Sequence, residues 1–133
     1  MAKEAPTMTV AVDDSGGSAR SIENDLTSVD FAIPRGVQDV TGVNKAAIER
    51  LLLLADFSAT LAGVFNDASN VSHDVFKTVA SASVARTVTI VTSGQTLPNE
   101  VFFTDYSLSR GSDGSLTFSA PCVLQSGTAP TWA

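Results

Sequence analysis

The sequence predicts a mainly β protein, an antiparallel β-sandwich or partial barrel with one short flanking α-helix. Between residues 57 and 124 the chain repeatedly alternates apolar with small or polar residues, and Gly, Asn or Asp turns close the alternating runs. Only residues 70–79 carry a clear helical stripe of apolar residues. The chain has 133 residues, of which 44% are hydrophobic, and this suits a single domain over 1–133 with one packed core.

The N-terminal part of the chain predicts one strand between two irregular segments. Residues 7–13 place alternate apolar side chains on one face, starting at Met8, as a half-buried strand does. Asp and Ser residues around two adjacent glycines then favour a mobile loop over residues 13–24. We expect residues 1–7 to form a flexible N-terminal arm.

The next part predicts strands interrupted by an ambiguous leucine-rich block. Residues 26–33 resume the alternation, and Pro34 ends this strand because proline has no backbone N–H to donate. Residues 38–41 fit a further short strand. Residues 44–55 contain strong helix formers but run directly into an alternating segment. We therefore expect a helical turn over 44–50, followed by strand.

The middle of the chain predicts two strands around the helix. In the run 56–66 the odd-numbered residues form the apolar face, and the even-numbered residues are mostly small. The helical stripe over 70–79 follows two capping candidates, Ser69 and Asn70. Residues 87–92 are β-branched at every position, which strongly favours a strand.

The C-terminal third predicts a β-hairpin. Residues 102–108 alternate, with Phe102 on the apolar face and Phe103 on the opposite face. Residues 115–124 alternate again, with the even-numbered residues on the apolar face. Between them, residues 110–114 contain glycines that tolerate positive φ, so a loop of about 4 to 5 residues joins the two strands.

Four residues are informative about the core. We expect Phe65 and Phe118 to lie inside it and Trp132 to close its edge. Cys122 lies on the apolar face of its strand, where a thiol usually behaves as a small buried hydrophobe. Because it is the single cysteine, it cannot form an internal disulfide, which agrees with a reducing compartment.

The charge balance argues against a protein that grips nucleic acid. Eight Lys and Arg residues against fourteen Asp and Glu residues give a net charge of −6. A DNA-binding chain needs clustered cations, whereas the basic residues here are spread singly. The longest apolar run, 51–55, is far shorter than the roughly 18 residues of a membrane-spanning helix. The N-terminus has no apolar signal segment, so we expect folding in a cytoplasm.

The candidate catalytic residues have a simpler interpretation as a turn. Asp14–Gly17 resembles the tetrapeptide around the nucleophile of chymotrypsin-like proteases, whose chemistry also needs a histidine base and a third group to orient it. The only histidine, His73, lies in the predicted helix beside Asp74. With no cysteine or second histidine nearby, His73 also gives little support to a zinc site.

The acidic residues near the first loop are the remaining candidates for a site. Asp13, Asp14, Glu23 and Asp25 could supply oxygen ligands to a cation, but they lack the fixed spacing of a calcium-binding loop. A solvated acidic loop is the simpler interpretation. No glycine-rich phosphate-binding motif follows a strand into a helix. The sequence therefore predicts no catalytic, cofactor-binding or metal-ligating residues, and no enzyme.

Several stretches resemble the major tail tube proteins of long-tailed, siphovirus-like bacteriophages. The resemblance covers roughly residue 25 to the C-terminus and is a pattern of elements and turns. It is carried by Asp39–Gly42, Leu54–Asn66 with the helix Val71–Val79, the hairpin Thr104–Pro121 and the closing Gly127–Trp132.

The resemblance implies a structural virion protein that assembles into hexameric rings. Stacked rings would form the hollow tail tube that delivers the genome into the host, and the DNA would pass through the lumen without specific binding. By position, residues 1–7 and 13–24 would make the contacts between rings. The implied partners are further copies of the chain and other tail proteins: tape measure, tail terminator and distal tail. The location would be the virion tail, after synthesis in the host cytoplasm, with no membrane.

The residues agree with this role. Only 17% of them are charged, and the small-polar sheet face suits close packing or a smooth lining. An acidic wall would also repel the phosphates of passing DNA. Two other classes stay open. A capsid decoration protein would share this composition, and a receptor- or carbohydrate-binding β-sandwich would need exposed aromatic platforms, for which Tyr106 and Trp132 are a thin supply.

Overall fold

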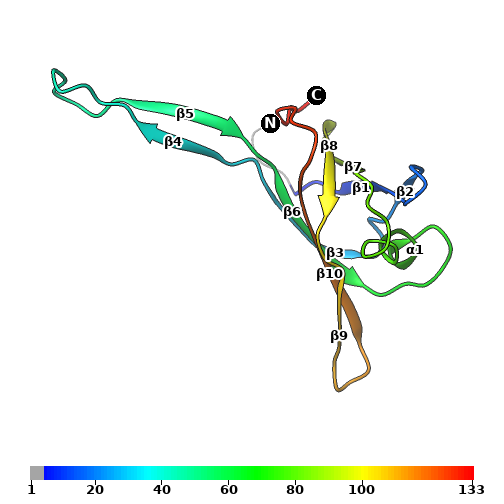
Figure 1. Cartoon of the computed structure of the whole chain (residues 1–133). Helices are drawn as coiled ribbons and strands as arrows, with labels where there is room; N and C mark the ends of the chain where they lie inside the picture. Colours follow the sequence, from blue (N-terminus) through cyan, green and yellow to red (C-terminus); the bar gives the residue numbers. More distant parts are fainter. Residues whose placement is uncertain (1–4) are drawn as a thin grey trace.

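Figure 1 shows the computed structural model, which describes residues 5–133, as a curved antiparallel sheet from which a long hairpin projects. The sheet has eight strands in the order β2-β1-β7-β8-β10-β6-β3, and β9 pairs with part of β10. Its strands are β1 Met8–Asp13, β2 Ala19–Ser21, β3 Leu26–Ala32, β6 Ser58–Val64, β7 Arg86–Thr92, β8 Gln95–Phe103, β9 Ser107–Arg110 and β10 Leu116–Leu124. The projecting hairpin consists of β4 (Arg35–Asp39) and β5 (Arg50–Ala55), and the helix α1 spans Ser72–Phe76.

One face of the sheet encloses a single core. Strands from both ends of the sheet contribute to it, because the buried Val10 of β1 and the partly buried Phe31 of β3 belong to the same cluster. Along β6 and β10 the alternate residues are buried as predicted, and Phe118 is in the core. The fold class is confirmed: a mainly antiparallel β protein with a partial barrel and one short helix.

The helix α1 is shorter than predicted, and its N-terminus is capped by a residue that is distant in the sequence. It spans five residues rather than 70–79, and its N-cap position, Val71, makes no side-chain capping bond. Instead the buried carboxylate of Asp25 accepts a hydrogen bond from the Ser72 backbone N–H (3.2 Å) and another from the Asn66 side-chain amide (2.9 Å). A carboxylate at a helix N-terminus satisfies free N–H groups and complements the helix dipole.

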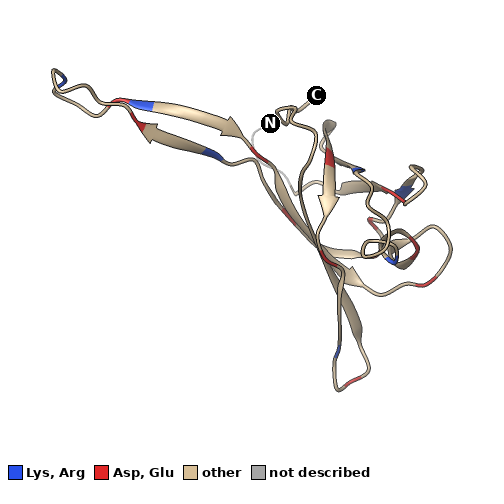
Figure 2. Cartoon of the chain, in the orientation of Figure 1, with Lys and Arg blue, Asp and Glu red and all other residues tan. Residues whose placement is uncertain are grey.

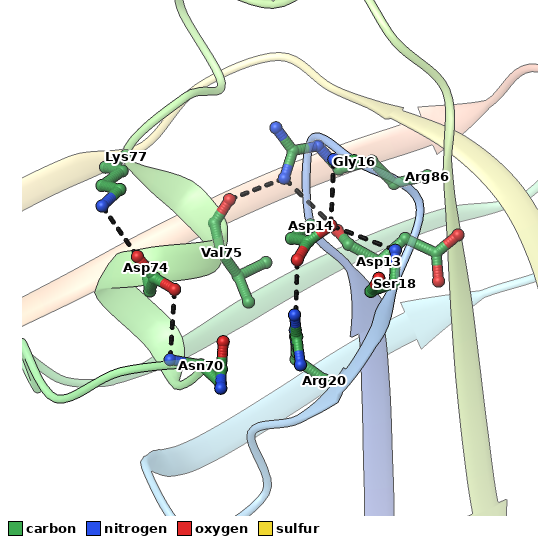
Figure 3. A network of polar contacts seen from close by, with 10 residues as sticks. All are labelled: Asp13, Asp14, Gly16, Ser18, Arg20, Asn70, Asp74, Val75, Lys77 and Arg86. Carbon is green, nitrogen blue, oxygen red and sulfur yellow. Dashed lines mark hydrogen bonds and ion pairs between the residues drawn. The ribbon is translucent and has the colours of Figure 1, made fainter.

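A buried arginine holds the other end of α1. The Arg86 side chain of β7 is 1% exposed, and its guanidinium donates to the Val75 carbonyl (2.6 Å), the Thr78 hydroxyl (2.9 Å) and the Asp13 carbonyl (3.3 Å), as Figure 3 shows in part. Burial is the main effect on the pKa of Arg86 and lowers it. An isolated five-residue helix would not be stable in water, so the two buried charges and the packing of Phe76 (5.1 Å between ring centroids from Phe103) keep it in place.

The leucine-rich block is strand and loop, not helix. The expected helical turn over 44–50 is wrong, because these residues form the tip of the projecting hairpin. The strand expected after it is confirmed as β5, although a break at Asp56 and Phe57 separates it from β6. The strand expected at 38–41 begins earlier, at Arg35. Cross-strand pairing of β4 with β5 has overridden the helix propensity of the block.

The run 102–108 is not one strand, because β8 ends at Phe103 and β9 begins at Ser107. Tyr106, on the predicted apolar face, packs against the core, but the predicted faces of Phe102 and Phe103 are wrong. Phe103 is buried (9% exposed) and Phe102 is exposed (43%), which reverses the prediction. The reason is that β8 starts at Gln95, and the buried Leu97 and Val101 fix the register that Phe103 continues. The predicted hairpin after it is confirmed, with β9 and β10 joined by residues 111–115 and Gly114 at φ +94°.

Two residues of the β6 region differ from the expected pattern. Phe65 is half-buried rather than central, and its ring packs on His73 with centroids 4.7 Å apart. Gly63 is paired with Leu26 where β3 has a register shift, and the backbone of Asp25 lies directly against its Cα. This close approach leaves no room for a side chain.

Candidate functional site

The hairpin of residues 35–55, called here the apolar hairpin, is the most unusual surface of the molecule. Its two strands pair only with each other, and it projects away from the sheet (Figure 1). Its exposed large apolar side chains are Val37, Val40, Val43, Ile48, Leu51, Leu52, Leu53 and Leu54. Consecutive leucines on a strand point to opposite faces, so both faces of the ribbon are apolar. An isolated two-stranded hairpin is marginal in water, and an exposed apolar patch of this kind marks an interaction surface.

The tip of the apolar hairpin is closed by a small polar network. The Thr41 hydroxyl donates to the Asp39 carboxylate (2.6 Å) and accepts from the Glu49 backbone N–H (2.8 Å). The Thr41 backbone N–H also donates to Asp39 (2.9 Å), and these two donors hold the pKa of Asp39 below its ordinary value. The tip therefore has a defined shape despite its exposure.

Few hydrogen bonds connect the base of the apolar hairpin to the sheet. β3 and β6 continue into β4 and β5, but two residues on each strand interrupt the ladder, Ile33 with Pro34 on one side and Asp56 with Phe57 on the other. One backbone bond spans this interruption, from the Asp56 N–H to the Pro34 carbonyl (3.0 Å). Pro34 has no N–H for a second bond, so the hairpin and the sheet are joined by few interactions.

Charge is divided unevenly between the apolar hairpin and the rest of the chain. Residues 35–55 hold three basic and two acidic side chains, a net charge of +1. Since the chain carries −6 in total, the remaining residues carry −7. Figure 2 shows the acidic residues, in red, distributed along the backbone of the sheet and its loops. The apolar hairpin and the rest of the chain therefore carry net charges of opposite sign.

The second notable surface is the outer face of the eight-stranded sheet, the face turned away from the core. Alternation places mostly small or polar side chains there, among them Thr60 and Ala62 of β6 and Ser119 of β10, together with the exposed Val64, Phe102 and Val123. The carboxylates of Asp30 (β3) and Glu100 (β8) are on this face. No Lys or Arg of the described strands of this sheet falls on it: Arg86 points into the core, and Arg20 and Arg110 are on the core side, paired with Val12 and Leu116.

The protease-like tetrapeptide forms a turn. One Asp14 carboxylate oxygen accepts from the backbone N–H groups of Gly16 (2.9 Å) and Ser18 (3.0 Å), and the other forms an ion pair with Arg20 Nε (3.1 Å; Figure 3). The Ser18 N–H and the Arg20 side chain lower the pKa of Asp14. The segment 13–24 also contains β2, whereas the sequence analysis assigned it to a loop.

The other candidate residues are engaged in the structure. His73 Nδ1 lies 3.0 Å from the Tyr106 hydroxyl. The Trp132 ring packs 6.1 Å from Phe31 between centroids, and Trp132 is 41% exposed. Cys122 is buried, and burial raises the pKa of its thiol to about 11. Asp25 holds α1, which sequence reasoning missed because its partners are distant in the chain.

Two further observations concern the described part of the chain, residues 5–133. No group of three or more His, Cys, Asp or Glu side chains comes together there as a metal site. The acidic residues considered as cation ligands therefore do not assemble within it. In the same range, no helix has the length and apolar composition that crossing a membrane requires.

Comparisons with known proteins identify the fold. No family model and no curated protein matches the chain. Among solved structures, it is similar to the tail of an empty gene transfer agent particle with C6 symmetry (TM-score 0.78, 15% identity, 95% of each chain covered). It is also similar to the SPP1 tail tube (TM-score 0.71, 8% identity, 94% of this chain and 75% of that one). A third similarity is to the anti-feeding prophage baseplate (TM-score 0.67, 12% identity, 100% and 97% covered).

These similarities define the class of fold: the chain has the tail tube fold. They extend over nearly all of the chain. Structures of a gene transfer agent tail and of the SPP1 tail tube share this fold with the present chain. The resemblance drawn from the sequence is thus confirmed at the level of the fold.

Proposed function

We propose that the chain is a structural, non-enzymatic subunit of a virion tail tube. In this proposal it self-associates into hexameric rings, and the rings stack into a hollow tube that conducts the genome into the host. The observation that carries the proposal is the apolar hairpin, which exposes eight large apolar side chains on a protein with the tail tube fold. Large exposed apolar patches of this kind mark surfaces that bind a partner. The C6 symmetry of a structure with the same fold supports the hexamer.

The apolar hairpin is the proposed contact between subunits. By the resemblance to tail tube proteins, residues 1–7 and 13–24 were the expected contacts between rings. Residues 1–4 lie outside the described residues, and in segment 13–24 Asp14, Gly16, Ser18 and Arg20 are bonded to one another. The apolar hairpin is a stronger candidate because burying its leucines would stabilise an assembly by roughly 25 cal/mol for each Å² of apolar surface removed from water.

The outer face of the sheet is the proposed lining of the lumen. It combines small side chains with the carboxylates of Asp30 and Glu100, and its described strands present no cation to it. Phosphate groups would find no Lys or Arg to bind on such a wall. DNA would therefore pass along it without specific binding. The tape measure, tail terminator and distal tail proteins are the further proposed partners, in a virion tail built from subunits made in the host cytoplasm.

Electron microscopy and light scattering of the purified protein test this function. We expect six-membered rings or hollow tubes with a regular axial repeat, and a mass that rises with protein concentration. A matched variant, Leu52→Ser with Leu54→Ser, should keep the circular dichroism spectrum of the wild type and lose the assemblies, because both side chains are exposed and outside the core. A trimer would instead favour a capsid decoration protein, and a monomer at every concentration would contradict self-assembly.

A further inference from the structure

We propose that β5 of the apolar hairpin docks into a hollow between β1 and β3 of a second copy, where Arg50 of the first copy pairs with Glu23 of the second. This inference rests on the proposed self-assembly and identifies the surface that receives the hairpin. Residues from β1, from β3 and from the segment before β3 line the hollow: Met8, Val10, Glu23, Leu26, Thr27, Ser28 and Val29.

The hollow presents apolar surface beside an unpaired strand edge. Met8, Leu26 and Val29 pack against the core but are only partly buried, so part of their surface faces the hollow. β3 is the last strand of the sheet, and among the described residues no strand pairs with its second edge. A seven-residue edge strand without Lys or Pro is poorly protected and favours association with another chain.

Glu23, which lines the hollow, has a carboxylate oxygen without a hydrogen-bond donor. Its Oε2 atom is buried and has no hydrogen-bond partner among the described residues. In the same part of the chain, the two ion pairs are Arg20 with Asp14 and Lys77 with Asp74, so no basic side chain pairs with Glu23. A buried carboxylate oxygen without a partner is costly, and a guanidinium supplies the strong donors that it lacks.

The apolar hairpin carries the complementary groups. Leu51 to Leu54 in β5 are exposed, with Leu54 at 91%, and Arg50 stands directly before them. The Arg50 side chain is exposed and makes no hydrogen bond or ion pair within residues 5–133. Arg35, by contrast, already donates through Nε to the Leu53 carbonyl (2.7 Å). An apolar strand with one free guanidinium thus matches an apolar hollow with one free carboxylate oxygen.

The occupant is a second copy rather than the same chain. The apolar hairpin continues directly from β3 and β6 and points away from the body (Figure 1). Its own β5 therefore cannot fold back over the β1 side of the sheet. The net charges of +1 on the hairpin and −7 on the remaining residues also favour docking of the hairpin on the body of another molecule.

Charge reversal and charge swap test the pairing. The variants are Glu23→Arg, Arg50→Glu and the double variant, with Asp67→Arg and Arg110→Glu as controls that make the same charge changes at exposed sites without side-chain bonds. The readout is the critical concentration for assembly, measured by light scattering, with circular dichroism as the check on folding. We expect each single test variant to raise the critical concentration at least tenfold, about the effect of removing one interfacial charge pair. The double variant should return the critical concentration to within about threefold of the wild-type value.

The outcomes separate this inference from the proposed function. If Arg50→Glu, which changes only an exposed side chain, leaves the critical concentration unchanged, the pairing is wrong while self-assembly stands. The pairing is also wrong if the double variant assembles no better than the poorer single variant. Should the N-terminal residues of the same chain fill the hollow, Glu23→Arg would lower stability without affecting assembly. Wild-type protein that never associates would overturn both proposals.

Discussion

Gly63→Ala should destabilise this protein severely, because β3 and β6 touch at that position. A Cβ atom on Gly63 would overlap the Asp25 carbonyl oxygen and would lie 2.9 Å from the Leu26 Cα atom. These obstructing atoms belong to the backbone, so no side-chain rotation can relieve the overlap. The two strands must separate, and the Val64 N–H bond to the Asp25 carbonyl (2.9 Å) must lengthen or break.

The expected cost follows from three contributions. Overpacking of this kind costs about 1–3 kcal/mol, and the loss of one backbone hydrogen bond costs about 1 kcal/mol. Movement of Asp25 also weakens its bonds to Ser72 and Asn66, which hold α1, at about 1 kcal/mol or more. The sum is about 3–5 kcal/mol, a large fraction of the stability of a domain of this size.

Urea unfolding monitored by circular dichroism measures this cost, and a thermal melt should show a Tm lower by roughly 10–20 °C. Gly36→Ala is the matched control, since it lies on an exposed strand and its added Cβ would be no closer than 3.4 Å to Leu53 Cδ1. We expect it to change stability by less than about 0.5 kcal/mol. A Gly63→Ala protein as stable as the control would refute the close contact of β3 with β6.

Three further outcomes are expected. Phe118→Asp should prevent folding, since the side chain is 3% exposed and a buried unpaired carboxylate costs several kcal/mol; a folded variant by circular dichroism would contradict this. Arg86→Leu should leave the Val75 and Asp13 carbonyls without their donor and speed hydrogen exchange in residues 72–82, at a cost of about 3 kcal/mol; unchanged exchange would argue against the role of Arg86. Cys122 should be inert to thiol reagents at pH 8 until the chain unfolds, and fast labelling of the native protein would contradict its burial. Because burial raises the pKa of its thiol to about 11, the stability that Cys122 contributes is complete below pH 9 and is lost between about pH 9 and 11.

Strands with regular alternation were predictable from the sequence, whereas the features set by distant contacts were not. The runs that became β6 and β10 carry an apolar residue at every second position, and their faces were assigned correctly. The first part of β8 was missed because Pro98 and Asn99 are turn formers. The sheet tolerates them there because one edge of β8 pairs with β7, whereas the other edge at this point forms only a few backbone hydrogen bonds with C-terminal residues, at Thr96 and Glu100.

The candidate site was the hardest part to predict. The strand over Leu51 to Leu54 was predicted despite their high helix propensity, but its pairing with β4 was not. Pairing across a long loop is invisible to a local pattern. The projection of this segment into solvent was also unpredictable, since four consecutive leucines normally indicate a buried strand or helix. The acidic composition, by contrast, could be read from the residues directly.

The apolar hairpin has a consequence for any assembly that it builds. A contact in which a projecting element of one molecule covers a different surface of the next is heterologous, so it does not close between two copies. Such a contact gives a closed ring when its rotation closes and an open assembly otherwise. If the hairpin joins one ring to the next, the stack has polarity: one end displays unoccupied hairpins, and the opposite end displays uncovered receiving surfaces. The two ends would therefore need different capping proteins, one that offers a receiving surface and one that offers a hairpin in its place.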